Sequence, residues 1–541
     1  MRLYQQIRAL IARSAVIGAG LVLFVSGMPL SASGQTAGVQ TPSGLPPIAA
    51  QPAPAGTPLA IDEAVKMALE NNLNIQIEKL NPQIQVLGIA RAASAYAPAL
   101  FTSLTRGSTT NAPQDIVSAA GTQVSTASNL RSNAGVLQNV RWGGGNYQVS
   151  FDGSRATSNQ LTAPFNPSLG SNLNASYTQP LLRNFKIDTI RQQLALSQAQ
   201  ATQADIQLQQ RITQTSRNVR VAYYQLVGAI ASLDVAQQSL DVARTSLKNN
   251  QTRVEVGTMA QIDIVQAEAE VASNEEGVIV AQAQIETAQD QLRALVLNPN
   301  QPDFWTARFT PSEQPTVAQK AINVDDAVKN ALANRTDIRD FKKQMDATDI
   351  NLRYGRNQKL PAVDLTARYG VTGFGGTQFE YGQVPVGEVP PILGQTDKGF
   401  GQVLRDVFGN DFKTWSVAVN VSYPLGTSTA DAAYAQAKLQ KQQEQTTLAN
   451  IEMGVTTAVR QAGRDVATNL RRIEATRRAE ELAETRLAAD NKRFSVGLAT
   501  TFEVLQSQRD LSRARSNALR AVIDYNMSLV DFEAVQIAPI R

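Results

Sequence analysis

The segment RVEVGTMAQIDIVQ, residues 253–266, decides the fold of this 541-residue chain, because it recurs as RFSVGLATTFEVLQ at residues 493–506. Arginine, valine, glycine, an acid and glutamine stand at the same offsets in both copies. Each copy interrupts a long helical pattern with a glycine, which can leave a helix through positive φ without a steric clash at Cβ. The segment therefore predicts the tip of an antiparallel helical hairpin, once in each half of a duplicated chain.

Three further pairs of landmarks support a tandem duplication. IDEAVKMAL at residues 61–69 returns as VDDAVKNAL at 324–332, and the early Asp in each copy is typical of a helix N-cap. A matching proline follows each copy, and a Pro-Leu pair precedes each long helical pattern. We therefore expect a first helix-strand-strand-helix repeat at 59–297 with strands within 99–179, an inter-repeat linker at 298–321, and a second repeat at 322–541 with strands within 362–423.

The N-terminus is typical of a secretory signal peptide, which we place at residues 1–33. Arg2, Arg8 and Arg13 precede an apolar core at 15–25, and small residues follow as a cleavage site at 31–33. A membrane anchor is the alternative, but the apolar core falls short of the ~20 residues that span a bilayer. Residues 34–58 are rich in Pro, Gly, Thr and Ala and are expected to form a flexible leader.

The composition excludes several classes of function. The chain has no Cys and no His, so disulfides, thiol nucleophiles, imidazole bases and the usual zinc ligands are absent. The net charge is +4 and no basic run resembles a nucleic-acid patch. No Gly-rich loop is followed by Lys-Ser or Lys-Thr, and no pair of carboxylates stands apart from helix surfaces. We expect neither an enzyme nor a cofactor, a metal site or a nucleic-acid partner.

The hydrophobic period changes from helix to strand after each early proline. Residues 362–371 and 415–423 alternate between apolar and polar side chains, as do 147–152 and 173–178. Residues 99–106 and 135–142 are weaker candidates. Strands of about ten residues with one apolar face and aromatic ends are what a membrane β-barrel needs. A soluble sandwich with one buried face would show the same alternation.

Very long helices follow the strands in both halves. No proline interrupts residues 184–250, and two sets of positions recur every seven residues, four places apart. One set is Leu208, Thr215, Ala222, Ala229, Ala236 and Ala243, and the other is Ile212, Val219, Leu226, Leu233, Leu240 and Leu247. This heptad seam predicts a helix that supercoils against its neighbours over about 100 Å. The second copy, from about 428 to 491, is similar.

The number of strands then points to an assembly. One chain offers four to six candidate strands, whereas a single-chain membrane barrel needs about eight. Open strand edges are not viable in lipid, because each unpaired backbone group costs several kcal/mol. Several chains must therefore share one barrel, and their helices would enclose one tube across the periplasm.

Taken together, residues 59–536 resemble the TolC family of outer-membrane efflux and secretion channels. The resemblance implies a mainly α fold with a membrane β part: a homotrimer whose outer-membrane β-barrel continues into a long periplasmic α-helical barrel. It implies twelve strands in lipid and short helices stacked end to end beside the long ones. The function implied is the exit duct of a tripartite efflux pump that exports small molecules, with a periplasmic membrane-fusion adaptor and, through it, an inner-membrane pump. The alternatives are the duct of a type I protein secretion system and a secreted structural coiled coil or adhesin.

The resemblance assigns two kinds of site. The tips would dock the adaptor through Arg253, Val256, Gly257, Thr258, Arg493, Val496, Gly497 and Leu498. Asp263 and Glu503 would form acidic rings in the pore constriction, where like charges favour cations. For these acids the alternative is a solvated carboxylate that caps a helix start.

The sequence departs from the family pattern in three places. The segment between Pro98 and Pro180 is longer than its counterpart, and its surplus includes a possible hairpin that turns at Gly143–Gly145. Phe494 and Ala499 stand where well-known members close the pore with Tyr and Arg. Gln506 replaces an acid that is often found there.

Overall fold

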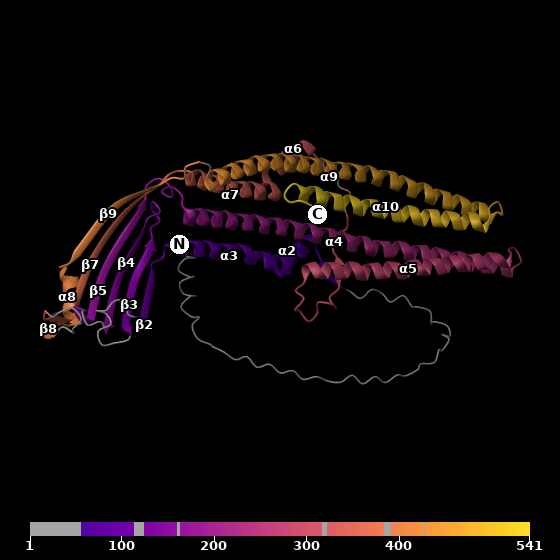
Figure 1. Ribbon diagram of the computed structural model, residues 1–541. Helices are drawn as coiled ribbons and strands as arrows, with labels where there is room; N and C mark the ends of the chain where they lie inside the picture. The colour runs from indigo at the N-terminus through magenta and orange to yellow at the C-terminus, as the bar shows by residue number, and fades with distance from the viewer. Residues whose placement is uncertain are drawn as a thin grey trace, which may run out of the picture. The chain divides into compact units, whose positions relative to one another are not determined.

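The computed structural model describes residues 56–112, 124–159, 163–315, 317, 322–383, 391–426 and 428–540. The predicted signal peptide and nearly all of the predicted leader lie outside these residues. Strands gather in one sheet, and the longest helices form two hairpins (Figure 1). No helix in the described ranges is long and apolar enough to cross a membrane.

Both halves begin with two short helices and end with a helical hairpin. The first half consists of α2 (Ile61–Asn71), α3 (Leu73–Ala93), the 3-10 helix η1 (Ser94–Tyr96), β2 (Ala99–Asn111), β3 (Ser125–Asn139), β4 (Asn146–Ser158), β5 (Phe165–Pro180), α4 (Thr189–Glu255) and α5 (Gln261–Val296). The second half consists of α6 (Val324–Asn334), α7 (Thr336–Gln358), β7 (Ala362–Tyr381), β8 (Ile392–Lys398), α8 (Phe400–Gly409), β9 (Lys413–Ser422), α9 (Thr429–Ser495) and α10 (Thr501–Val535).

The heptad seam predicted in α4 is confirmed. Every seam position from 208 to 247 is buried or half-buried, and Val219 and Leu226 are fully inaccessible to solvent. α4 packs on α3 and α7 in its first part, and on α5 and α10 in its later part. Burying one apolar stripe in this way supplies most of the stability of a helix of this length.

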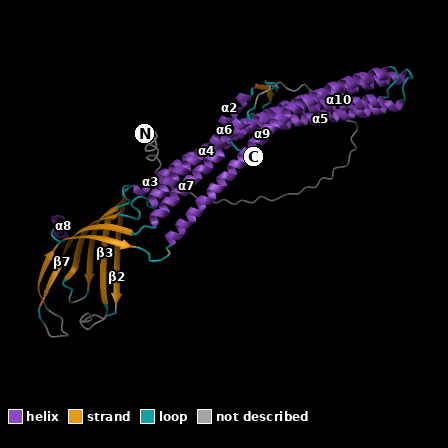
Figure 2. Ribbon diagram, turned by 90° about the horizontal axis from the view of Figure 1, so that it is seen from above, coloured by secondary structure: helices purple, strands orange, loops and turns teal. Residues whose placement is uncertain are grey.

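The short helices stack end to end beside the long ones, as the resemblance implied. At the first joint, Asn72 Nδ2 at the start of α3 donates to Leu295 O in the last turn of α5 at 3.1 Å. At the second, Arg335 Nη1 at the start of α7 donates to Val535 O at the end of α10 at 3.0 Å. Figure 2 shows α10 beside α9 at one end of the helical region and α7 at the other. Each half thus sets one continuous helix against two shorter helices.

The starts of α2 and α6 differ from the prediction. Asp62 and Asp325 lie inside the first turn rather than at the N-cap. In the first turn, their negative charges interact favourably with the positive end of the helix dipole. The N-cap of α6 is Asn323, whose side chain accepts from the backbone N–H groups of residues 325 and 326. The N-cap of α2 is Ala60, which has no side-chain acceptor.

One antiparallel sheet contains seven strands in the order β2-β3-β4-β5-β7, with β8 and β9 both paired to β7. β9 pairs with the first half of β7, at residues 362–371, and β8 pairs with its last residues. The free edges of the sheet are therefore β2 on one side, and β9 and the short β8 on the other. The strands lie side by side in a curved layer (Figure 2).

The prediction of two strands per repeat is wrong for the first repeat, which has four long strands. The weak candidates at 99–106 and 135–142 belong to β2 and β3, and Gly143–Gly145 lie in the turn between β3 and β4. Ser, Thr and Asn are frequent in β2 and β3, so polar side chains occupy parts of both faces. The alternation that reveals a strand in a sequence is therefore faint in both.

A short parallel pair joins the end of the predicted leader to the inter-repeat linker. β1 (Thr57–Leu59) pairs with β6 (Phe309–Pro311), so the leader prediction is wrong for residues 57 and 58. Leu59 and Phe309 enter a core cluster with Leu226 of α4 and Leu292 of α5. This apolar contact fixes the β1–β6 pair against the helices. A flexible leader would not be held in this way.

Candidate functional site

The first tip, between α4 and α5, is a tight turn that a glycine makes possible. Gly257 has φ +72°, and the turn is closed by Gly257 N–H to Val254 O at 2.9 Å and Thr258 N–H to Arg253 O at 2.9 Å. The Thr258 hydroxyl donates to the same Arg253 oxygen at 2.9 Å. These bonds satisfy carbonyl groups that the end of a helix leaves free.

The second tip repeats this geometry. Gly497 has φ +75°, Gly497 N–H donates to Phe494 O at 3.2 Å, and Leu498 N–H donates to Arg493 O at 2.8 Å. Arg493 Nη2 also donates to Leu498 O at 3.2 Å. The prediction of two matched hairpin tips is therefore confirmed at the level of individual hydrogen bonds.

Apolar side chains next to both glycines are exposed. Val256 is 67% exposed, Val496 68% and Leu498 70%. Ile262 and Phe502, in the first turn after each tip, are also exposed. Each tip therefore presents a small apolar surface around a hydrogen-bonded turn.

Arg253 joins the two tips. Its guanidinium carbon lies 4.5 Å from the centroid of the Phe494 ring, and its Nη1 is 3.5 Å from Phe494 O. Cation–π contacts of this kind contribute about 0.5–1 kcal/mol at exposed sites. The sequence indicated Phe494 only as a departure from the family pattern. It gave no signal for this contact, because the two residues are 241 positions apart.

The two predicted pore acids have different surroundings. Glu503 forms a capping box with Thr500: the Thr500 N–H donates to Glu503 Oε2 at 2.7 Å, and the Glu503 N–H donates to Thr500 Oγ1 at 3.3 Å. Asp263 lies half-buried in the first turn of α5. Within the described part of one chain, no ion pair or hydrogen bond links Asp263 to Glu503, and no group of acids could hold a metal ion.

A second contact joins the hairpins about two turns beyond the tips. Arg509 of α10 donates from Nε and Nη2 to Glu270 Oε2 of α5 at 2.8 and 2.6 Å. The carboxylate of Glu270 is nearly buried and also accepts from Asn274. Hydrogen bonding and attraction to this carboxylate raise the pKa of the Arg509 guanidinium further above its usual range. The sequence did not indicate this pair.

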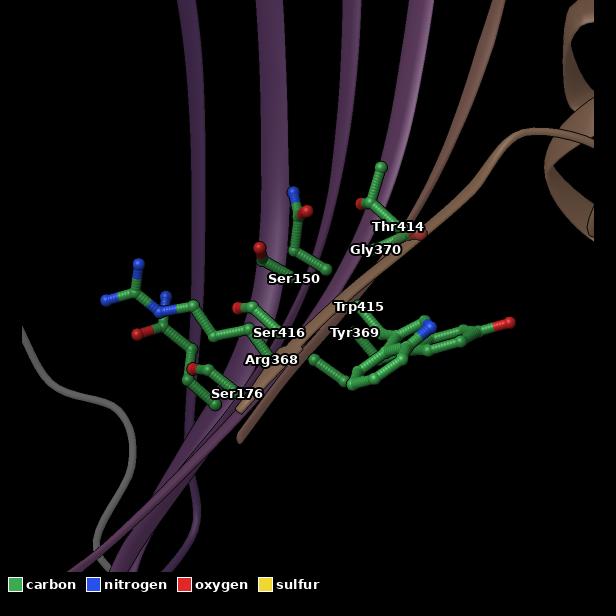
Figure 3. A pocket seen from close by; sticks show the side chains of 11 residues that line it. Ser150, Ser176, Arg368, Tyr369, Gly370, Thr414, Trp415 and Ser416 are labelled. Carbon is green, nitrogen blue, oxygen red and sulfur yellow. Dashed lines mark hydrogen bonds between the residues drawn. The ribbon is translucent and has the colours of Figure 1, made fainter. Parts of the chain in front are cut away.

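The two faces of the sheet differ in chemistry. One face carries a hollow of about 430 Å³ lined mainly by polar side chains, among them Ser150, Ser176, Arg368 and Ser416. Figure 3 shows Arg368 and the serines on one side of the strands, whereas Tyr369 and Trp415 point to the other. The face with Tyr369 and Trp415 is the apolar face that the alternation predicted, and on β9 it is open to the surroundings.

Comparisons with known proteins agree with this architecture. The family model described as "Outer membrane efflux protein" matches residues 147–296 and 327–533. The outer membrane protein TolC of Escherichia coli K12 is 22% identical over 333 residues, which are 59% of this chain and 60% of that protein. The chain thus aligns with less than two thirds of that relative's length. The predicted resemblance to the TolC family is confirmed.

Solved structures show the same fold. The channel VceC of Vibrio cholerae has a TM-score of 0.60 at 15% identity, covering 88% of this chain and 96% of that chain. The CmeC channel of Campylobacter jejuni has a TM-score of 0.61 at 15% identity, covering 88% and 85%. The family match spans the helical hairpins of both halves and the strands next to them. The chain therefore belongs to the outer membrane efflux protein family, whose TolC-like fold places its sheet in the outer membrane and its helices in the periplasm.

Proposed function

We propose that three copies of this chain form the outer-membrane exit duct of a tripartite efflux pump for small molecules. The observation that carries the proposal is the direct passage from strands long enough to cross a membrane into helices of 67 residues. At 1.5 Å per residue such a helix is about 100 Å long, enough to reach far into the periplasm. The open sheet requires further copies, because its edges cannot stay unpaired in lipid.

The tips are the proposed docking surface for a periplasmic adaptor. The apolar residues Val256, Val496 and Leu498 stand on turns that Gly257 and Gly497 hold in one shape, so little conformational entropy is lost on binding. Arg253 and Arg493 fix the turns and supply charge beside the apolar surface. Thr258 occupies the position of Leu498 in the first tip, so the two tips offer related but unequal surfaces to the adaptor.

Docking is tested by Leu498→Asp, with Leu482→Asp as its matched control. Leu482 is 68% exposed, almost the same as Leu498, but lies on the shaft of α9, away from the tip. A charge at an apolar contact is expected to abolish efflux of a fluorescent cation from cells when placed at 498 and to leave it intact at 482. Equal loss in both variants at normal trimer levels would contradict docking at the tip.

Asp263 and Glu503 are proposed to supply negative charge at the narrow end of the tube. Three copies of each would create a strong field that attracts cations. Because Glu503 already accepts from the N–H of Thr500, we expect Asp263 to account for more of the binding of a multivalent cation. The two proposed roles of Glu503, cap and ring, are compatible, because a carboxylate has further lone pairs free.

The function is tested by single-channel recording of purified protein in a planar bilayer, with and without a millimolar trivalent cation. We expect cation-selective conductance that the trivalent ion blocks from the side of the tips, with block weakened by Asp263→Asn and less so by Glu503→Gln. Conductance that the trivalent ion does not block would agree with the proposed duct but contradict the proposed acidic ring. A folded trimer that never conducts, with adaptor hairpins added, would contradict the duct itself.

A further inference from the structure

The sheet contains more membrane-length strands than the family pattern provides. A strand needs about 9–11 residues to cross the hydrocarbon core. Six strands reach this length: β2 and β4 with 13 residues each, β3 with 15, β5 with 16, β7 with 20 and β9 with 10. β8, with 7 residues, does not. The surplus over four strands per chain is the hairpin β2–β3, which lies outside the family match.

The additional hairpin continues the two-faced surface of the other strands. The strand registers place one residue of each strand in a row across the sheet on the apolar face: Leu100, Val136, Val149, Ala175, Tyr369 and Trp415. On the opposite face the adjacent row has Phe101 on β2 and Gly135 on β3, and the next row is polar throughout: Ser103, Asn133, Asp152, Asn172 and Thr372. Leu100 and Leu104 of β2 are 79% and 74% exposed, as expected for side chains that face lipid.

The hairpin is also anchored where the sheet meets the helices. The turn between β3 and β4 is closed by Val140 N–H to Gly145 O at 2.7 Å and held by Gln179 Nε2 to Gly143 O at 2.8 Å. Asn139 Nδ2 donates to Ala95 O of η1 at 2.9 Å. β3 pairs with β4 along the whole of β4. Folding the hairpin away from the sheet would break this entire ladder.

The two free edges suit each other. Among the six long strands, β2 and β9 are the end strands, and each of their outer sides carries a row of unpaired backbone groups. Because all six long strands alternate in direction, β2 and β9 run in opposite directions, so β9 of one copy meets β2 of the next as an antiparallel pair. An even number of strands per chain lets this pairing repeat around a ring.

We propose that three copies close a barrel of eighteen strands, in which β9 of each chain pairs with β2 of its neighbour. The proposal rests on the trimeric duct proposed above and specifies its membrane part. The geometry favours it over twelve strands. At 4.8 Å spacing and a tilt near 40°, each strand takes about 6 Å of circumference, so eighteen strands give about 110 Å and twelve about 75 Å.

The helical tube provides an independent comparison of size. Next to the sheet, each chain contributes four helices in the order α3, α4, α7 and α9, and three chains contribute twelve. At 8–10 Å between helix axes, twelve helices close a ring of roughly 95–120 Å. The circumference of an eighteen-strand barrel is therefore nearly equal to that of this ring of helices, whereas a twelve-strand barrel would be narrower than the ring.

Cross-linking can test which strand meets β9, because the natural chain has no cysteine. Val417→Cys on β9 is combined in turn with Leu100→Cys, Thr102→Cys and Leu104→Cys, which lie on the same face of β2. The three positions cover the range of registers, since cross-strand neighbours at the right register have Cβ atoms about 4.5–5.5 Å apart. The matched controls combine Val417→Cys with Val149→Cys or Phe151→Cys, on the same face of β4. Oxidation is carried out on intact outer membranes, and oligomer size is measured on purified protein.

Covalent dimers and trimers with at least one β2 partner, and monomers with both β4 partners, are the expected result. Cross-links through β4, or a normal trimer with no β2 cross-link, would overturn the eighteen-strand barrel but leave the trimeric duct. Absence of a trimer in the cysteine-free parent would overturn the duct as well. As a second readout, end-on images of the purified trimer by electron cryo-microscopy should resolve eighteen strands, and a count of twelve would contradict the proposal.

Discussion

At each hairpin tip a single glycine reverses the direction of the chain. No heavy atom lies within 4 Å of a Cβ built on Gly257, so its positive φ, and not lack of space, is what requires glycine. We expect Gly257→Ala to destabilise the first hairpin by about 1–2 kcal/mol, the cost of the left-handed conformation for a residue with a Cβ. Faster amide hydrogen exchange over residues 250–262 would report this loss of stability.

Gly277 supplies the opposite control. It is exposed in the middle of α5, has ordinary helical geometry and also has open space at its Cβ. Gly277→Ala should slow exchange in α5, since Ala is about 0.5–1 kcal/mol more favourable than Gly in a helix. If both alanine variants shifted exchange in the same direction, the backbone explanation would be wrong.

The start of α9 is expected to weaken in acid. The side chain of Ser428, then that of Lys359, hydrogen-bonds the Asp431 carboxylate and lowers its pKa from 3.8. A lowered pKa in the folded state means that the stabilisation is present above pH 3.8 and is lost as the pH falls through the lower folded value. Exchange of the first-turn amides of α9 should therefore rise below about pH 4. Ser428→Ala should reduce the pH dependence, and an unchanged profile in that variant would contradict the cap.

Residues with a local role could be predicted from the sequence, and residues with a long-range role could not. Gly257 and Gly497 could be identified because the residues that form each turn are adjacent in the sequence. The Arg253–Phe494 contact depends on how two hairpins pack side by side, which no local pattern encodes. Glu503 had two predicted roles, of which the capping box is present and the pore ring stays a prediction.

At the scale of elements, α4 holds the short β1–β6 pair through hydrogen bonds of the Tyr223 hydroxyl. Tyr223 Oη donates to Leu59 O at 3.1 Å and accepts from the Glu313 N–H at 3.2 Å, and its side chain is fully buried. Tyr223→Phe would remove both of these hydrogen bonds, each of which contributes about 0.5–1.5 kcal/mol. Limited proteolysis should then cut near residues 309–313 faster. The neighbouring Tyr224→Phe, which keeps these bonds, should be cut at the parental rate.

The ion pair between Glu270 and Arg509 is a polar link between the two hairpins, and its carboxylate is nearly buried. Arg509→Ala would leave the nearly buried carboxylate of Glu270 without its cation, which we expect to loosen α5 from α10 and raise the open probability of the channel severalfold. Recording the double variant that also carries Glu270→Gln separates the effect of losing the ion pair from the effect of leaving the Glu270 charge unpaired. If the pair acts as a link, the double variant should resemble the single one, and additive effects would argue against coupling.

The helices could be predicted more completely than the strands for a physical reason. The seam of α4 repeats through about eleven turns of buried or half-buried positions, so individual exceptions do not hide it. β2 and β3 have few residues with strong apolar character, and their pairing partners decide their structure more than their composition does. The signs of additional strands were the longer segment between Pro98 and Pro180, its two weak strand candidates and the possible turn at Gly143–Gly145.

For the whole molecule, the orientation of the sheet in the membrane can be tested on two adjacent residues of β9. Val419 pairs with Leu365 on the apolar face, and Asn420 pairs with Asp364 on the polar face. Arginine on the lipid side of a barrel costs about 2–4 kcal/mol near the middle of the bilayer, whereas a lumen position tolerates it. Val419→Arg should therefore reduce the yield of membrane-inserted trimer, and Asn420→Arg should not. A reversed result would mean that the apolar face lines the lumen.

The end-to-end joints give the tube an uneven mechanical construction. α4 and α9 follow directly from strands and run unbroken to the tips, so they act as continuous rods that transmit torque. α5 and α10 have no direct covalent connection to the sheet: they pack along α4 and α9, and they meet α3 and α7 end to end through contacts such as Asn72 to Leu295. In the proposed trimer, we expect a load applied at the tips to be relieved by slip or bending at these joints. The periplasmic mouth would then widen while the wall within the membrane keeps its circumference.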